Sequence, residues 1–382
     1  MRRLALLLAC IPFVAFAQFD PAAVEAGPLD GGKMWLFEDP PVDYLEETYG
    51  FRPDEAWFEH AKLAALRMPG CSASFVSPNG LVATNHHCGQ GSIIRVSEEG
   101  EGLLDNGFYA RSLEEERQVP NLYMDQLVEI EDVTDHVTAM IDAAGAQTDA
   151  EAAAASAEAV EAVQEAIQAE RGEGFTVQVV ALYNGGRYSA YTYRRYTDVR
   201  LVMAPEARLG YFGGDFDNFT YPRYALDFSF FRIYENGEPM QTEHYFPLSA
   251  DGVEEDDLVF VIGNPGSTSR GLTVAQLETT HNITNPTILH FLDERIETLQ
   301  AYLESGPDNP DAVRGQLFGL LNSQKAYRGR IAALDDEYIM ARRAAAERNF
   351  RNASEAAGDL IDAIAALQEQ RSEMANEFRA FR

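Results

Sequence analysis

The stretch Cys71–Gly89, CSASFVSPNGLVATNHHCG, decides the fold of this chain. Apolar and small or polar side chains alternate in its first seven residues, and the sequence Pro78-Asn79-Gly80 is typical of a turn. A second apolar run, LVATN, follows the turn. This pattern predicts a β-hairpin over Cys71–Asn85.

Two adjacent histidines, His86 and His87, and then Cys88 follow the hairpin. Adjacent side chains on an extended backbone point to opposite sides, so we expect His86 and His87 to have different roles. Cys71 and Cys88 form an even pair, which in an oxidising compartment favours one disulfide. A zinc site is the alternative, but it would need a ligand spacing such as CxxC, which the chain lacks.

The first 17 residues have the features of a secretory signal peptide: two arginines, an apolar run and a small-x-small ending at Ala17. Cleavage there would leave Gln18 as the mature N-terminus, although Cys10 keeps a lipoprotein signal open as an alternative. No later segment is apolar enough and long enough to span a bilayer. We therefore expect a periplasmic or secreted protein.

The composition is that of an acidic folded protein, with 46% hydrophobic and 11% aromatic residues. Removing Arg2 and Arg3 from the 30 basic residues leaves 28 against 61 acidic residues, a net charge of −33. Such a charge repels nucleic acid and anionic membranes, so we expect neither as a partner. A solvated acidic surface explains the charge more simply than an acidic binding function.

The β texture continues beyond the hairpin and then gives way to helices. Alternating segments predict strands in FTVQVVALY, RYSAYTYRRYTDVRLVMA, LDFSFFRIY and DLVFVIG. An Ala/Glu-rich helix lies near residues 145–172, and its low complexity predicts an exposed insertion. An earlier segment, Tyr44–Arg67, has a helical pattern. Beyond about Val274 the pattern is helical, with Ile288, Leu292, Ile296, Leu299 and Leu303 on one face and further helices over 311–334 and 338–381.

The hairpin resembles the first barrel of chymotrypsin-like serine proteases, in which a histidine just before a cysteine is the general base. Four segments in order extend this resemblance to the bacterial dipeptidyl-peptidase 7 and 11 family. They are KMWLFED (33–39), the hairpin itself, YFGGDFDNFTYPRYALDFSFFRIY (211–234) and VIGNPGSTSRGLT (261–273). The family consists of exported serine exopeptidases that remove dipeptides from the free N-termini of oligopeptides.

The resemblance implies an α+β fold, a chymotrypsin-like double β-barrel with an inserted α-helical cap domain that covers the active site. We expect a signal peptide over 1–17, the β domain over 18–274 and the cap over 275–382. The chain ends within a helical pattern, which indicates a truncated cap and an incomplete second barrel.

Residue by residue, the resemblance implies His87 as the general base and Asp227 as the aspartate that orients it. His86 is then structural or faces the substrate. Asp215 and Asp217 are the competing acids, but their glycine-rich loop favours a turn-forming or site-shaping role for them.

The same resemblance implies that Asn218 binds the α-amino group of the substrate, with Phe219 as an aromatic wall beside it. Asn322, in LLNSQKAYRG, is a second candidate for the amine site. Phe219 and Tyr221 stand where the family usually has tryptophan, and Tyr224 stands where it commonly has histidine.

The sequence offers no convincing candidate for the nucleophilic serine. The chain contains no Gly-[Asp/Asn]-Ser-Gly tetrapeptide, and Ser267 follows Pro-Gly in an element that is structural in related proteases. Together with the resemblance, this favours a serine dipeptidyl aminopeptidase from which the nucleophile-bearing segment is absent, and so an inactive fragment. The alternative is a catalytically inactive exported homologue that binds peptides.

We expect no cofactor and no metal, because His60, His86 and His87 lack the HExxH type of spacing that a metal hydrolase would use. Oligopeptides are the expected partners, and a homodimer is left open.

Overall fold

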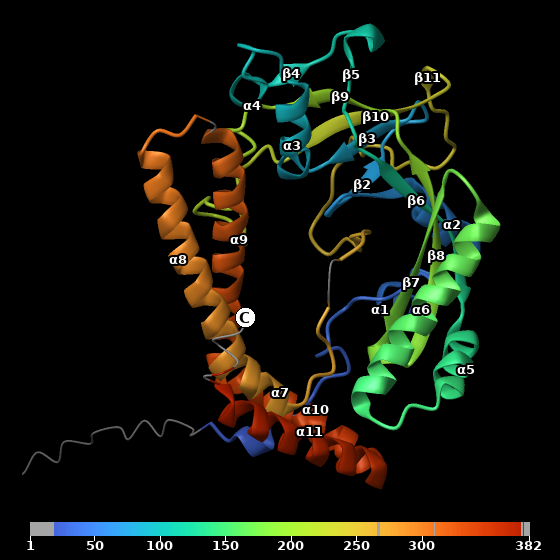
Figure 1. The fold of residues 1–382 in the computed structure, drawn as a ribbon, viewed down its shortest axis with the longest axis vertical. Coiled ribbons are helices and arrows are strands. Elements are labelled where there is room, and N and C mark those ends of the chain that lie inside the picture. The colour runs from blue at the N-terminus through green and yellow to red at the C-terminus, as the bar shows by residue number, and fades with distance from the viewer. Residues whose placement is uncertain (1–18, 266–267, 309, 376, 378–382) are drawn as a thin grey trace, which may run out of the picture. The chain divides into compact units, whose positions relative to one another are not determined.

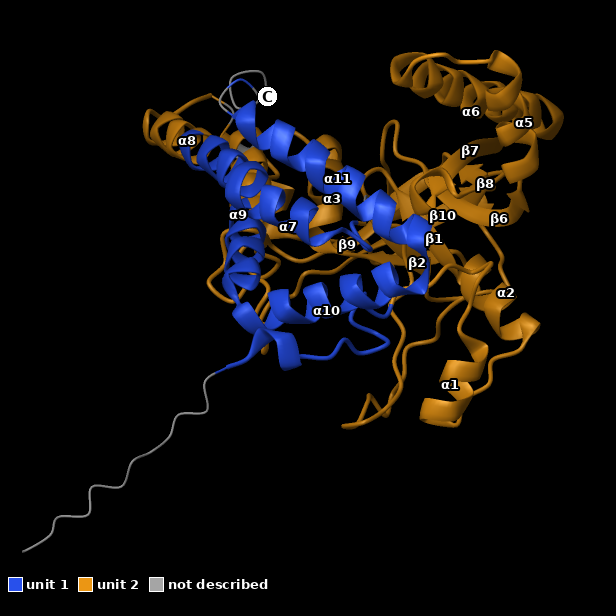
Figure 2. Cartoon of the chain, turned by 90° about the horizontal axis from the view of Figure 1, so that it is seen from below, with its two compact units in different colours: residues 1–33, 269–294, 324–382 blue, residues 34–268, 295–323 orange. Residues whose placement is uncertain are grey.

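A computed structural model describes residues 19–265, 268–308, 310–375 and 377. The chain forms two compact units (Figure 2). The larger consists of 34–268 and 295–323, and the smaller of 1–33, 269–294 and 324–382. The predicted signal peptide, its Cys10 and Ser267 lie outside the described residues.

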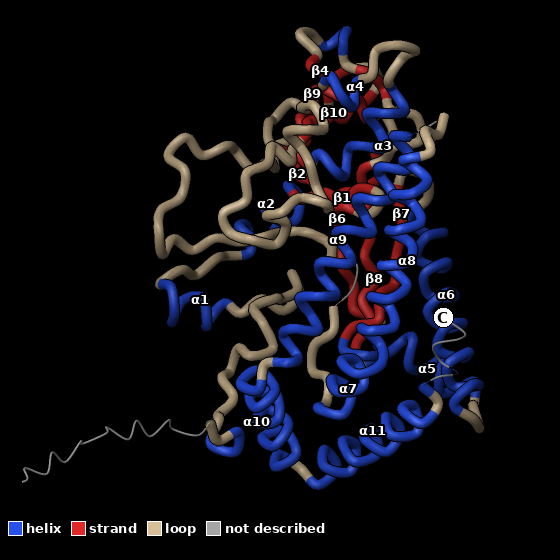
Figure 3. The backbone as a smooth tube through the Cα atoms, turned by 90° about the vertical axis from the view of Figure 1, so that its left-hand side faces the viewer, coloured by secondary structure: helices blue, strands red, loops and turns tan. Residues whose placement is uncertain are grey.

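An antiparallel sheet forms the framework of the larger unit (Figures 1 and 3). Its strands follow the order β4-β9-β10-β3-β2-β1-β6-β8-β7, while β5 pairs with β9 and β11 with β10. The strands are β1 Ala65–Met68, β2 Cys71–Phe75, β3 Leu81–Thr84, β4 Phe108–Tyr109, β5 Arg117–Gln118, β6 Met124–Asp132, β7 Phe175–Leu182, β8 Arg187–Tyr196, β9 Val199–Ala204, β10 Ser229–Glu235 and β11 Glu238–Pro239.

The predicted hairpin is present as β2 and β3, which pair in the register Phe75↔Val82. Gly80 in its turn has a φ of 66°, and a Cβ there would approach the Ile233 carbonyl to 2.9 Å. The hairpin is therefore packed tightly against its neighbour β10. The inward side chains of β2 and β3 join Phe231 of β10 in the main core.

The disulfide predicted between Cys71 and Cys88 is confirmed, with Cα atoms 6.1 Å apart. Cys88 lies in the first turn of α3 (His86–Val96), so the bond joins the start of β2 to the start of this helix. Both sulfurs pack against the main core.

The predicted Ala/Glu-rich helix is present as α6 (Asp149–Arg171) and begins with a capping box made by Thr148 and Glu151. The sequence suggested an exposed insertion, and this is wrong for one face. Ala155, Ala159 and Val163 are buried, and the last two join a core formed with α5 (Thr134–Ala144) and with β7 and β8. Small side chains on that face allow the helix to lie close to its neighbours.

The segment 44–67, which has a helical pattern, forms two helices and the first residues of a strand. Helix α1 (Val42–Tyr49) ends at Gly50, whose left-handed φ of 66° lets its N–H bond back to the helix. Asp54 then caps α2 (Glu55–Ala64), and Ala65 begins β1. Pairing with β2 and β6 holds the last residues extended despite their helical pattern.

The strand predicted over DLVFVIG, residues 257–263, is also wrong, because the structure has a loop there. A strand needs a neighbour to satisfy its backbone groups, and no described residue pairs with this segment. Val261 is fully exposed and Val259 is 64% exposed. The described part of the sheet records no pairing between its end strands β4 and β7, so the double barrel stays a prediction.

The smaller unit is helical. It contains α7 (Val274–Thr279), a π-helical turn (Thr280–Thr284), α10 (Glu337–Ala353) and α11 (Glu355–Glu373). It shares α8 (Asn285–Glu304) and α9 (Pro310–Asp335) with the larger unit. The helix predicted over 338–381 is broken at Ser354, which caps α11.

Within the larger unit, the ends of α8 and α9 pack through Ile296, Leu299 and Leu317, and Leu303 lies against them. The described helices are each too short or too polar to cross a membrane.

Reduction of the Cys71–Cys88 bond should lower the free energy of unfolding of the larger unit by about 3 kcal/mol, because the bond closes a loop of 17 residues. Urea unfolding followed by tryptophan fluorescence, with and without a phosphine reductant, measures this loss. The Cys71→Ser/Cys88→Ser variant is the control, since it should be equally unstable with and without reductant. An unchanged midpoint for the reduced parent would contradict the prediction.

Candidate active site

The sheet brings His87 and Asp227 together. Thr84, the last residue of β3, pairs with Ser229, the first residue of β10. His87 lies three residues after Thr84, and Asp227 two residues before Ser229. His87 Nδ1 is 2.8 Å from Asp227 Oδ2 and 3.0 Å from Oδ1. The predicted hydrogen bond is therefore present, and it belongs to His87 rather than to His86.

The Asp227 carboxylate is nearly buried, at 7% side-chain exposure, and accepts further hydrogen bonds. The backbone N–H of His87 donates to Oδ1 at 3.0 Å, and Asn85 Nδ2 lies 3.3 Å from Oδ2. Burial by itself would raise the pKa of Asp227, but the hydrogen bonds from His87 and the nearby charge of Arg223 lower it below its ordinary value. The group is an anion at the N-terminus of α3, where the helix dipole favours one.

The two histidines do not lie on extended backbone as predicted, because they form the first turn of α3. Adjacent helical side chains still point in different directions. His86 is 2% exposed, and its burial lowers the pKa of the imidazole, against a smaller effect of the Pro205 carbonyl. The ring packs against Gly210, where a Cβ would come within 2.6 Å of it. His86 is therefore a core residue that fixes the start of the helix.

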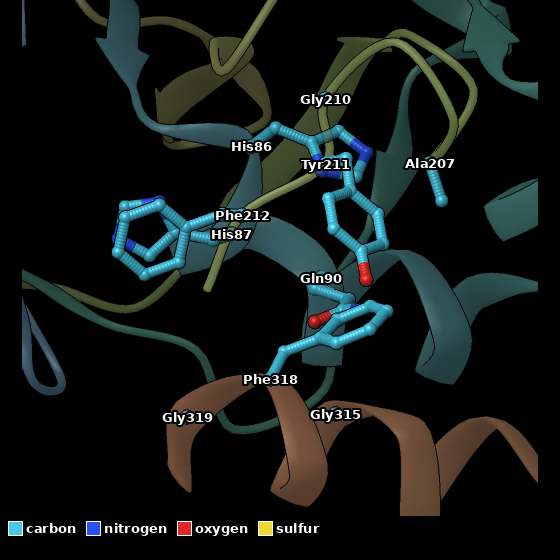
Figure 4. A pocket seen from close by; sticks show the side chains of 10 residues that line it. All are labelled: His86, His87, Gln90, Ala207, Gly210, Tyr211, Phe212, Gly315, Phe318 and Gly319. Carbon is cyan, nitrogen blue, oxygen red and sulfur yellow. The ribbon is translucent and has the colours of Figure 1, made fainter. Parts of the chain in front are cut away.

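A cavity of about 120 Å³ lies beside His87 (Figure 4). Its wall is formed by His86, His87, Gln90, Ala207, Gly210, Tyr211, Phe212, Gly315, Phe318 and Gly319. The aromatic rings of Tyr211 and Phe318 meet edge to face across it, with centroids 4.7 Å apart. All of these residues belong to the larger unit, and Gly315 and Gly319 leave space along one face of α9.

The glycine-rich loop before β10 surrounds the pair, as the sequence suggested for Asp215 and Asp217. Asp215 accepts from the Gly213 N–H at 2.7 Å and from Arg223 Nε at 2.8 Å. Asp217 accepts from the Tyr224 N–H. Neither acid is hydrogen-bonded to His87 in the described structure, so both shape the loop.

The two asparagines predicted for amine binding also meet. Asn218 is 2% exposed and donates from Nδ2 to Asn322 Oδ1 of α9 at 3.0 Å. The predicted aromatic neighbours are exposed: Phe219 by 64%, Tyr221 by 97% and Tyr224 by 86%. Phe219 has a φ of +58°, a rare conformation for a bulky residue and one that tends to occur at functional loops.

One group of possible metal ligands occurs among the described residues, formed by Cys71, His87 and Cys88. Both sulfurs are in the disulfide, so neither can be a thiolate ligand. Among the described residues, the His87 imidazole is hydrogen-bonded to Asp227 and not to a serine hydroxyl.

Sequence reasoning missed three neighbours of the pair: Asn85, Phe212 and Arg223. The Phe212 ring is stacked on the His87 imidazole, with centroids 3.8 Å apart and planes 12° apart. Motif spacing predicts the bond between an acid and a histidine, but it does not predict which ring of a loop will stack on the imidazole.

A buried carboxylate that fixes one nitrogen of an imidazole beside a cavity is the arrangement used by hydrolases that activate a hydroxyl nucleophile. Comparison with known families agrees with this class. Residues 29–382 match the model of the Peptidase S46 family, and the chain belongs to that family.

Two curated relatives illustrate the similarity. The chain is 29% identical over 302 residues to dipeptidyl-peptidase 7 of Phocaeicola vulgatus, a match that covers 76% of this chain and 42% of the relative. It is 32% identical over 295 residues to an Asp/Glu-specific dipeptidyl-peptidase of Capnocytophaga gingivalis, covering 74% and 41%. The matches thus span about two fifths of the length of these relatives.

A solved structure shares the fold. The crystal structure of Porphyromonas endodontalis DPP11 in complex with the dipeptide Arg-Glu has a TM-score of 0.75 and 25% sequence identity. The match covers 92% of this chain and 53% of that one.

The loop leaves no room for a side chain at Gly213. Its φ is +99°, and a Cβ there would lie 2.1 Å from the Phe318 carbonyl oxygen. Gly213→Ala should therefore destabilise the larger unit by about 2 kcal/mol or more, through backbone strain and overpacking.

The matched control is Gly319→Ala, because a Cβ at that helical position meets nothing within 4 Å. Alanine there should be neutral or stabilise the unit by about 0.5–1 kcal/mol. Urea unfolding of the two variants measures both effects. Equal stabilities for the two variants would show that the loop does not pack against α9 in this way.

Proposed function

We propose that this chain provides the general base, its orienting aspartate and the amine-binding site of an exported serine dipeptidyl aminopeptidase. The observation that carries the proposal is the hydrogen bond between His87 Nδ1 and the nearly buried Asp227 carboxylate. This bond fixes the tautomer in which Nε2 is free to accept a proton from a hydroxyl. The names of the relatives support dipeptide release as the reaction.

Asn218 and Asn322 suit the recognition of a free N-terminus. An ammonium group has three donors and no acceptor, and the two side-chain amide oxygens offer acceptors from two different elements. Because the amine is held at a fixed distance from the reacting bond, cleavage occurs at a fixed number of residues from the N-terminus. Phe219 directly follows Asn218 in the chain, and its aromatic side chain would limit the width of the amine site.

The nucleophile would come from a serine that the described residues do not place beside His87. A helical cover over the site is proposed as well, because Gly315 and Gly319 of α9 border the cavity within the larger unit. Export is proposed from the disulfide, which persists in oxidising compartments.

The second candidate is a homologue that binds peptides without cleaving them. The retained pair of His87 and Asp227 argues against it, since simple peptide binding has no use for a nearly buried acid beside an imidazole. The two functions differ only in hydrolysis, so binding and cleavage have to be measured separately.

Binding can be tested on this chain by calorimetry or by NMR titration with dipeptides. A dipeptide with a free α-amine should bind about 10–100-fold more tightly than its N-acetylated form, the value of one or two hydrogen bonds to a charged group. Asn218→Ala should remove most of that difference. Asn184→Ala, in an exposed turn of the same unit, is the control and should leave it intact.

Cleavage is tested by the release of dipeptides from dipeptidyl amides. The 382-residue chain should release none, whereas a protein extended by the C-terminal half of a family member should do so. In that protein His87→Ala should reduce turnover by about 10⁴–10⁶. Labelling of the 382-residue chain by a fluorophosphonate probe would contradict the proposal that the chain lacks the nucleophile. Ser267 would then be the first serine to test. Binding without cleavage in the extended protein would favour the second candidate.

A further inference from the structure

The loop that precedes β10 contacts the His87–Asp227 pair at two points, and the proposed function assigns neither contact. Phe212 stacks on the imidazole of His87. Arg223 approaches the carboxylate of Asp227, with Nη1 3.6 Å from Oδ2. Both residues come from the loop whose acids shape the site.

Arg223 is fixed by hydrogen bonds to two other residues of the loop. Its Nε donates to Asp215 at 2.8 Å, and its Nη2 donates to the Tyr211 carbonyl at 3.0 Å. Its guanidinium also lies 5.2 Å from the centre of the Phe212 ring. The arginine therefore links three residues of the loop, and its Nη1 is the guanidinium nitrogen that faces Asp227.

Phe212 and Asp227 restrict different motions of His87. Hydrogen bonds to the two carboxylate oxygens fix where Nδ1 lies, but they allow the ring to tilt about that point. A second ring stacked at 3.8 Å and 12° fixes the plane. Together the two contacts determine the direction of Nε2.

We propose that Phe212 and Arg223 form a clamp that positions the His87–Asp227 pair and sets how readily His87 takes up a proton. This proposal rests on the proposed function only for the role of the pair, in which His87 is the general base and Asp227 orients it. Phe212 and Arg223 are positioning residues, because neither is placed to react with substrate.

The two halves of the clamp act on His87 in opposite directions. The negative face of the Phe212 ring stabilises an imidazolium stacked on it. The positive charge of Arg223 partly neutralises Asp227 and disfavours a second cation nearby. The clamp would thus keep the imidazole a strong enough base to accept a proton and a strong enough acid to return it.

Among the described residues, further titratable groups lie on the elements around His87 and the clamp. His86 lies on α3, Asp227 precedes β10, and Tyr211 and Asp215 lie on the loop itself. The residues of α9 that border the cavity are Gly315, Phe318 and Gly319, which carry no charge. Substitutions in the clamp can therefore be read without a compensating charge from that helix.

The test is an NMR titration of the His87 imidazole in this chain, in parent and variants. Arg223→Met should raise the titration midpoint by about 0.5–1 pH unit, and Arg223→Lys should largely restore it. Phe212→Leu should lower the midpoint by a few tenths of a unit, and Phe212→Tyr should restore it. Removing Arg223 should also raise the pKa of Asp227, which that charge helps to lower.

Arg200→Met is the matched control, because Arg200 also pairs with a carboxylate (Asp198) and lies over an aromatic ring (Tyr234). It should leave the His87 midpoint unchanged.

Loosening of the site would move both clamp variants the same way, because it would weaken the same hydrogen bond between His87 and Asp227 in each. Shifts of the same sign, or shifts equal to that of Arg200→Met, would overturn the proposal. The titration does not depend on peptide hydrolysis. An extended protein that fails to cleave would therefore contradict the proposed function, while the opposite shifts would still establish the clamp.

Discussion

The Asp227 carboxylate is the group on which the arrangement of the site depends. It lies just ahead of β10, and it accepts the backbone N–H of His87 at the start of α3 as well as the side-chain Nδ1. A carboxylate with 7% exposure is costly unless its oxygens are satisfied, so these bonds hold strand and helix in one arrangement. The disulfide from Cys88 to Cys71 ties the same helical turn to β2. The helix start is thus fixed from two strands.

The parts of the fold that the sequence predicted are those in which local chemistry and long-range packing agree. The hairpin of β2 and β3 has a turn sequence, alternating side chains and a cysteine at its beginning, and it formed with the expected boundaries within a residue or so. The capped Ala/Glu-rich helix α6 is a similar case. At these positions each local preference supports the same structure.

The wrong predictions are those in which a partner decided the outcome. Residues 257–263 have the composition of a strand but no described neighbour to pair with. Residues 65–67, by contrast, end a segment with a helical pattern but have two neighbours that hold them extended. Periodicity reports how a segment could bury its apolar side chains. It does not report whether another strand lies alongside. The same limit applies to the site: the pairing of His87 with Asp227 follows a motif, while the stacking of Phe212 depends on the path of a glycine loop.

The glycine-rich loop before β10 combines glycines, which allow close backbone approach, with charged residues, which fix its path by hydrogen bonds. Gly210 and Gly213 allow the backbone to lie against His86 and against the Phe318 carbonyl, where any side chain would collide. Asp215 and Arg223 then fix the loop by hydrogen bonds from within, and Phe212 is left facing the imidazole. A loop of larger residues would have to stand away from the helix start and could not bring an aromatic ring to 3.8 Å from His87. Close backbone approach is therefore the condition under which charge and stacking can act on the same imidazole, which is why glycines (Gly210, Gly213) and charged residues (Asp215, Arg223) occur in the same loop.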